Sequence, residues 1–273
     1  MKCKVFLVHV SLLMHARLLH GISVEEELTL TQQEKNALDK FKLIVENDPS
    51  VPEAYMKEDI YLIRWLRIGK LDLARTENKF KEHLRWRHDN KIGTILEEDF
   101  SAVGETFPMF LDGEDKTGRP IIAASASAWD VRRGVISGSR DAAVRYIYYA
   151  IEYQARKIRE KQKLGQNVTQ IQVILDLSGY NIVQHGCLNC IPIYLEFVRT
   201  YVYRYPYLAD SVIFVNVPPV FEIVVQTLNL RNARTTQIKI FGPRKSEWQK
   251  YLLSIVNRDQ LPKFLGGTLD DDT

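Results

Sequence analysis

The first part of the chain has its apolar side chains at the three- and four-residue spacing of amphipathic helices. Leu38, Phe41 and Val45 recur at i, i+3 and i+7, which places them on one helical face. The preceding residues 31–34, Thr-Gln-Gln-Glu, have the form of a capping box. Residues 31–88 are therefore expected to form a compact helical unit, followed by a mixed connector over 89–118.

From residue 119 onward the pattern changes to short apolar runs that alternate with helical segments. The runs that lack a helical period predict strands at 120–124, 171–177, 211–217 and 237–241. The segments between and after them predict helices at 139–163, 188–205, 220–230 and 246–256. Strands that alternate with helices over about 150 residues are typical of an α/β domain with a mostly parallel sheet.

Two of these helices are unusually apolar. Between residues 219 and 230 the polar side chains Glu222, Gln226 and Asn229 form one narrow stripe. Such a helix is either buried on most sides or faces a lipid ligand or a membrane, and its period alone favours a buried core helix. In the preceding helix Phe197 and Tyr201 lie on one face with Tyr205, an arrangement that is also normal for a core.

The start of the chain has the features of a secretory signal peptide. Lys2 and Lys4 precede a mostly apolar stretch, and a small-x-small triplet ends at Ser23. We therefore expect residues 1–23 to be a leader and the protein to be secreted. The alternatives are an amphipathic helix that lies on the body of the protein, and a cytoplasmic location. A single sequon at Asn167 supports secretion only weakly, because one sequon is expected by chance.

Composition and charge exclude several classes of protein. The 37 basic and 34 acidic residues leave a net charge of +3, too small for an electrostatic nucleic-acid binder. The three cysteines cannot build a disulfide scaffold. Cys187 and Cys190 lack the second ligand pair of a zinc site, so they are either partly buried thiols at a helix start or a local disulfide. No phosphate-binding loop, no metal site and no nucleophile–base pair is evident, so we expect neither a cofactor nor catalysis.

The order of several motifs resembles that of the CRAL-TRIO family of lipid-binding proteins. The resemblance spans about residues 28–270. Within the family, the chain is similar to the animal branch with tocopherol- and squalene-associated members and to the yeast phosphatidylinositol-transfer-like branch. The motifs that carry it are Asp59–Arg67, Leu84–Arg87, Gly118–Pro120, Val173–Gly179, Tyr205-Pro206, Phe214–Phe221 and Leu261–Gly267.

The resemblance implies an N-terminal helical bracket over residues 28–95 and an α/β lipid-binding lobe over 105–270. It also implies that one hydrophobic molecule lies between the sheet and helices, under a mobile gate helix. Alternate residues of a strand share one side, so Ile171, Val173 and Leu175 are expected to face this ligand. The full set of expected ligand-binding residues is Ile122, Ala124, Ile147, Ile151, Ile171, Val173, Leu175, Phe197, Tyr201, Tyr205 and Phe214. The expected gate residues are Phe221, Val224, Val225 and Leu228.

Departures from the family pattern bear on the identity of the ligand. Where phosphatidylinositol-transfer members have a threonine, a lysine and a glutamate for the inositol phosphate, this chain has Arg234, Gln237 and Tyr207. Two hydroxyls that bind choline phospholipid are replaced by Ile171 and Val173. We therefore expect a monomer that binds and transfers a hydrophobic small molecule or lipid of the tocopherol, retinoid, sterol or phospholipid class, with transient membrane contact. The alternative is a phosphoinositide-presenting regulator of intracellular lipid signalling.

Overall fold

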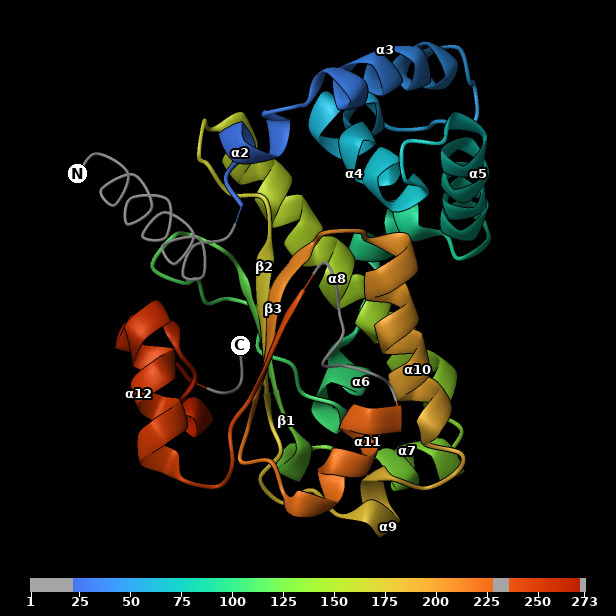
Figure 1. The fold of residues 1–273 in the computed structure, drawn as a ribbon. Helices are drawn as coiled ribbons and strands as arrows, with labels where there is room; N and C mark the ends of the chain where they lie inside the picture. The colour runs from blue at the N-terminus through green and yellow to red at the C-terminus, as the bar shows by residue number, and fades with distance from the viewer. Residues whose placement is uncertain (1–21, 228–235, 271–273) are drawn as a thin grey trace, which may run out of the picture.

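The computed structural model describes residues 22–227 and 236–270, and its N-terminal part is a group of helices (Figure 1). They are α2 (Val24–Leu28), α3 (Gln32–Glu46), the short 3₁₀ helix η1 (Ala54–Lys57), α4 (Asp59–Gly69) and α5 (Leu73–Asp89). We call this group the bracket. The expected helical unit is confirmed, and its helices α3, α4 and α5 contact one another.

The bracket has its own apolar core, and its first long helix begins where the sequence predicts. Thr31 and Glu34 form the complete capping box of α3. Leu38, Phe41 and Val45 are buried, and the ring of Phe41 meets that of Phe80 edge to face. The amphipathic spacing therefore identified the buried face of α3 correctly.

The rest of the chain forms an α/β lobe. After η2 (Ile92–Glu97) and α6 (Ser101–Thr106), the elements of the lobe follow in the expected alternation. They are β1 (Ile121–Ser125), η3 (Ala126–Ala128), α7 (Val131–Ile136), α8 (Arg140–Lys163), β2 (Ile171–Asp176), α9 (Ile182–His185), α10 (Ile191–Arg199), the π-helical turn η4 (Thr200–Arg204), β3 (Ala209–Val215), η5 (Pro219–Phe221), α11 (Glu222–Thr227), β4 (Gln237–Ile240), α12 (Lys245–Ile255), η7 (Arg258–Gln260) and η8 (Lys263–Leu265).

The four strands form one parallel sheet in the order β1-β2-β3-β4. One face packs against α12 through Trp248, Leu252 and Val256, which form a buried cluster with Ile174 and Ile213. The other face is covered by α8, α10 and α11, which lie on the opposite side of the sheet from α12 (Figure 1). We call these the α12 face and the α10 face.

One expected helix has different bounds in the structure. The segment predicted as a helix over 188–205 begins at Ile191, because Cys187–Cys190 form a closed loop before it. It passes into the π-helical turn after Arg199. The end of the expected gate helix, including Leu228, lies outside the described residues, as do residues 1–21 of the expected leader.

The end of the expected leader and the residues that follow it are tied to the lobe. Ser23 caps α2 in a complete capping box with Glu26. The amide of Ile22 donates to Gln170 Oε1 at 2.9 Å, and that of Val24 donates to Asn167 Oδ1 at 2.5 Å. Cleavage after Ser23 would therefore remove both the α2 cap and the Ile22 contact. None of the helices in residues 22–227 and 236–270 has the length and apolar character that crossing a bilayer requires.

Candidate functional site

The α10 face of the sheet carries only apolar side chains at its facing positions. The register aligns Ile122 with Val173, Val173 with Val212, and Val212 with Ile238. A second row of facing residues lies two residues further along each strand. On β2, Ile171 lies before both rows. The second row consists of Ala124, Leu175, Phe214 and Ile240.

Ten of the eleven expected ligand-binding residues lie in one apolar cluster on this face. Buried members from the sheet and α8 are Ile122, Ala124, Ile147, Ile151, Ile171 and Val173, and Tyr205 is buried with them. Leu175, Phe197 and Tyr201 are partly buried against the same cluster. Phe214 lies instead in the neighbouring cluster under α11. The structure therefore gathers the expected residues at one surface, and whether that surface binds a ligand stays a prediction.

The centre of the α10 face is incompletely covered. Leu175 and Val212 are partly exposed, although they lie on the two middle strands. Their sequence neighbours on the α12 face, Ile174 and Ile213, are both 0% exposed. Leu175 and Val212 each contact both the cluster under α10 and the cluster under α11. The helical layer thus leaves Leu175 and Val212 partly exposed where these two clusters meet, and we call this place the central opening.

Helix α11 and the preceding turn η5, which carries Phe221, cover the β3–β4 side of this face. Phe221 and Val225 are 7% and 1% exposed and pack with Leu177 and Phe214, while Val224 is partly buried. Ile223 on the opposite side of the helix is 63% exposed. The expected gate residues that are described therefore face the sheet.

Three sheet positions next to the opening were missed among the candidate residues. Val212, Ile238 and Ile240 share the α10 face with Val173 and Phe214. The alternation rule that selected Ile171, Val173 and Leu175 on β2 would have found them on β3 and β4.

Tyr205 has a structural role that sets it apart from Phe197 and Tyr201. Its hydroxyl donates to Glu152 Oε2 at 2.5 Å, and Arg87 and Arg159 contact the same carboxylate at 2.9 Å. Burial opposes the charged form of Glu152, but the two guanidinium groups outweigh it and lower its pKa. These groups join the bracket to the lobe, so Tyr205 is part of that junction.

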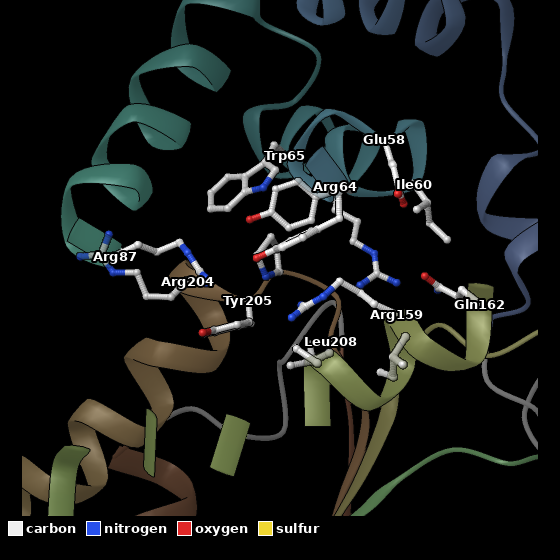
Figure 2. A pocket seen from close by; sticks show the side chains of 15 residues that line it. Glu58, Ile60, Arg64, Trp65, Arg87, Arg159, Gln162, Arg204, Tyr205 and Leu208 are labelled. Atoms are coloured by element: carbon white, nitrogen blue, oxygen red, sulfur yellow. The ribbon is translucent and has the colours of Figure 1, made fainter. Parts of the chain in front are cut away.

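A pocket opens at this junction, and arginines gather around it (Figure 2). Arg64 pairs with Glu27 at 2.7 Å, and Arg87 pairs with Glu53 as well as with Glu152. The guanidinium of Arg204 lies 5.3 Å from the centre of the Trp86 ring. Most of the positive charge is therefore already matched by carboxylates of the protein, so the junction has the character of an ion-pair network.

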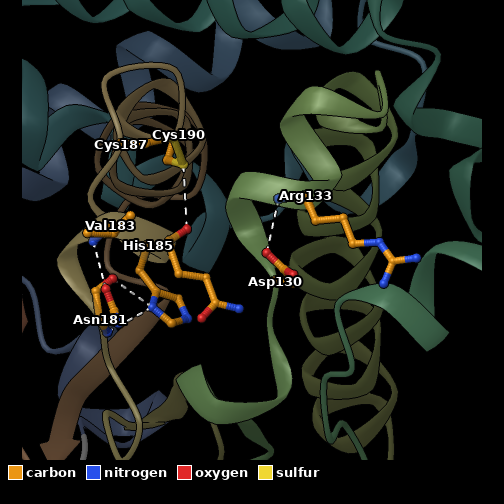
Figure 3. Close-up of a disulfide and its surroundings, with 8 residues drawn as sticks. Asp130, Arg133, Asn181, Val183, His185, Cys187 and Cys190 are labelled. Carbon is orange, nitrogen blue, oxygen red and sulfur yellow. Dashed lines mark hydrogen bonds between the residues drawn. A yellow bond between two sulfur atoms is a disulfide. The ribbon is translucent and has the colours of Figure 1, made fainter.

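The two cysteines form a disulfide immediately before α10 (Figure 3). Nearby, the His185 ring accepts at Nδ1 from the Asn181 amide at 3.0 Å, and its Nε2 lies 2.9 Å from the carbonyl oxygens of Ala126 and Trp129. A ring that accepts at Nδ1 and donates at Nε2 satisfies both contacts. Of the two alternatives, the disulfide is the one found, and no cluster that could hold a metal occurs among the described residues.

Exposed apolar side chains gather around this disulfide loop. We call Ile136, Ile182, Val183 and Leu188 the apolar tip; they are 74%, 53%, 59% and 85% exposed. Helices α7 and α9, which carry three of them, contact each other and lie at the same end of the lobe as α11 (Figure 1). Leu43 and Leu164 are similarly exposed elsewhere, so the tip is distinguished by the grouping of its four apolar side chains.

The headgroup positions that depart from the family pattern and are described in the structure are apolar or non-basic. Ile171 and Val173 are both 0% exposed within the sheet. Gln237 begins β4, and Tyr207 follows the π-helical turn with a φ of 60°. Arg234 lies outside the described residues.

Comparison with known proteins gives consistent results for sequence and fold. A phosphatidylinositol/phosphatidylcholine transfer protein of Arabidopsis thaliana, SFH12, is 26% identical over 86% of this chain, and Protein real-time of Anopheles gambiae is 26% identical over 76% of it. The chain spans less than half of either relative, 44% and 31% of their lengths. The crystal structure of Sfh5 superposes with a TM-score of 0.65 over 81% of this chain and 84% of its own, at 15% identity, which supports the fold. The CRAL/TRIO domain model matches residues 104–267, more than half of the sequence. The chain therefore belongs to the CRAL/TRIO domain family.

Proposed function

We propose that this protein binds one hydrophobic small molecule or lipid against the α10 face of its sheet and transfers it between membranes, without catalysis. The observation that carries the proposal is the central opening, where Leu175 and Val212 stay partly exposed on the two middle strands of the sheet. Burial of apolar surface stabilises by about 25 cal/mol per Å². A hydrophobic molecule that covers this place would therefore gain binding energy from a surface the protein leaves incompletely covered.

Helix α11 is the proposed gate. Phe221 and Val225 pack on the sheet, whereas Ile223 points to solvent at 63% exposure. A short helix with apolar side chains on both sides exchanges water for lipid at little cost when it opens at a bilayer. Opening would expose the sheet beneath it to the membrane.

The apolar tip is the proposed membrane contact. Val183 and Leu188 are more than half exposed; Leu188 lies within the disulfide loop that precedes α10, and Val183 lies on α9 before it. Arg132 and Arg133 lie beside Ile136 on α7, where they suit the negative surface of an anionic bilayer. The tip would therefore place α10 and α11 next to the membrane from which the ligand comes.

For the location of the protein, the secretory leader remains our proposal, with a cytoplasmic location as the alternative. The Cys187–Cys190 disulfide suits an oxidising compartment. Mass analysis of the N-terminus from a eukaryotic secretion host tests this. A chain in the medium that starts near Val24, with glycan at Asn167, is the expected result, and an intact Met1 on cytosolic protein contradicts it.

Native mass spectrometry and lipid extraction of the purified full-length chain test the function itself. The expected result is one neutral or zwitterionic lipid per chain, together with transfer of a fluorescent lipid between vesicles. A folded protein without lipid and without transfer activity would contradict the proposal. Recovery of a phosphoinositide as the bound lipid would instead favour the signalling alternative.

A further inference from the structure

The hydroxyl of Tyr201 is buried without a partner at the apolar cluster of the α10 face. Its oxygen has almost no contact with solvent, and no group among the described residues pairs with it. The ring packs against the apolar cluster that contains Val173. It meets the Phe197 ring edge to face, with 4.9 Å between the ring centres. Burial raises the pKa of this phenol, so the hydroxyl keeps its proton at neutral pH.

The hydroxyls of Tyr148 on α8 and of Thr200 on η4 are both paired, in contrast to that of Tyr201. The hydroxyl of Tyr148 donates to Glu196 Oε1 at 2.7 Å, and that of Thr200 donates to the Glu196 carbonyl at 2.8 Å. Two other buried atoms without partners in the described part of the chain lie elsewhere. They are His83 Nδ1, in the bracket, and Gln154 Oε1, whose amide nitrogen bonds the backbone at β1. Of these three atoms, the Tyr201 hydroxyl is thus the one whose ring packs against the apolar cluster of the α10 face.

The charge of the surroundings limits what this hydroxyl can bind. The facing positions of the sheet, from Ile122 to Ile240, are apolar and offer no cation for a phosphate. A phenolic hydroxyl can donate one hydrogen bond and accept others. The matching ligand therefore has an apolar body and an uncharged oxygen.

We propose that Tyr201 hydrogen-bonds the hydroxyl or carbonyl oxygen of a neutral lipid and thereby selects oxygenated neutral lipids over hydrocarbons and phospholipids. This inference rests on the proposed lipid-binding function and specifies its ligand class. A buried hydroxyl without a partner destabilises a protein, whereas the same hydroxyl paired with a ligand contributes to affinity. Tyr201→Phe should therefore stabilise the lipid-free protein and weaken binding of an oxygenated ligand.

The test measures affinity of the delipidated full-length chain for two matched pairs of probes. The pairs are cholesterol with 5-cholestene, and oleyl alcohol with 9-octadecene, with phosphatidylcholine as a fifth probe. The wild-type protein should prefer the alcohol of each pair, and Tyr201→Phe should reduce that preference about fivefold to tenfold, the effect of one hydrogen bond. Its melting temperature without lipid should rise.

Tyr148→Phe is the matched control, because it removes a paired hydroxyl from the facing helix α8. It should lower the melting temperature and leave the preference for alcohols unchanged. An unchanged preference in Tyr201→Phe, or a wild-type preference for phosphatidylcholine over both alcohols, would overturn the role of Tyr201 while lipid binding itself stands. Failure of the wild-type protein to bind any of the five probes would overturn the proposed function, and this inference with it.

Discussion

The two faces of the sheet are built from the same strands but packed in different ways. On the α12 face Ile174, Ile213 and Val215 are 0% exposed beneath Trp248 and Leu252. On the α10 face the alternating neighbours Leu175 and Val212 remain partly exposed beneath α10 and α11. At its two middle strands the sheet therefore has one closed face and one face that its helices do not cover completely.

This difference separates the residues that hold the fold from those available for a ligand. Protein interiors are close-packed, so a fully buried face has no room for another molecule. A face that stays partly open gives up some stabilisation from burial and leaves apolar surface for a partner. We infer that the α12 face and the bracket supply stability and that the α10 face supplies binding.

Truncation of one leucine on each face should give the largest effect. Leu252→Ala removes contacts of a side chain that is 0% exposed and should cost about 2–5 kcal/mol of unfolding free energy. Leu175→Ala is the same change at a partly exposed position and should cost about 1–2 kcal/mol, below the usual range for a buried leucine. Urea unfolding measures both. Equal losses would contradict the comparison of the two faces.

A charge in the gate should separate stability from transfer. Val225→Asp places a carboxylate against the sheet and should abolish lipid transfer, while the small helix α11 detaches and the domain stays folded. Ile223→Asp, on the exposed side of the same helix, should preserve closure and serves as the control. Thermal melting and vesicle transfer are measured on the same samples. If Val225→Asp unfolds the whole domain, α11 is an ordinary core helix.

A buried histidine should make the bracket sensitive to acid. Burial, and then the charges of Arg87 and Arg204, lower the pKa of His83 well below its usual value of 6.5. Its Nε2 lies 3.0 Å from the Tyr61 hydroxyl, among aromatic rings that include Trp65 and Trp86.

Below pH 6.5 the His83 side chain is therefore protonated in the unfolded chain but stays neutral in the folded protein. Stability should fall with decreasing pH by up to about 1.4 kcal/mol per unit. His83→Asn should flatten this slope between pH 7 and 5.5, whereas His88→Asn, at an exposed position on the same helix, should not. If the stability of the wild-type protein did not fall with decreasing pH, His83 would have to be protonated in the folded protein.

The apolar tip should have the smallest effect on stability. Val183→Ser with Leu188→Ser changes two exposed side chains, so the free energy of unfolding should shift by about 0.5 kcal/mol or less. Sedimentation with anionic vesicles should nevertheless show weaker binding. If this double variant bound vesicles as well as the wild-type protein does, the membrane contact would have to lie elsewhere on the protein.

Local patterns in the sequence predicted the parts of the fold that depend on local physics. Residues 31–34 predicted the α3 cap, and the alternation of Ile171, Val173 and Leu175 predicted a shared sheet face. These features depend on neighbours a few residues apart, which a sequence displays directly.

Contacts between residues far apart in the sequence could not be predicted from such local patterns. Tyr205 was expected at the ligand, yet its hydroxyl bonds Glu152, which is 53 residues away in the chain. Nothing near Tyr205 in the sequence indicates that partner. The unpaired Tyr201 hydroxyl was equally hidden, because pairing of a buried group depends on how α8, α10 and the sheet come together.

The most direct test of the account places the same larger side chain on each face of one strand. Val212 is partly exposed on the α10 face of β3, and Val215 is 0% exposed on the α12 face. Val212→Phe should fill the central opening and reduce bound lipid per chain, with the melting temperature retained. Val215→Phe should overpack a closed core, costing about 1–3 kcal/mol, with lipid per folded chain unchanged. Equal destabilisation by both variants, with bound lipid unaltered in both, would contradict the claim that the α10 face is the binding site.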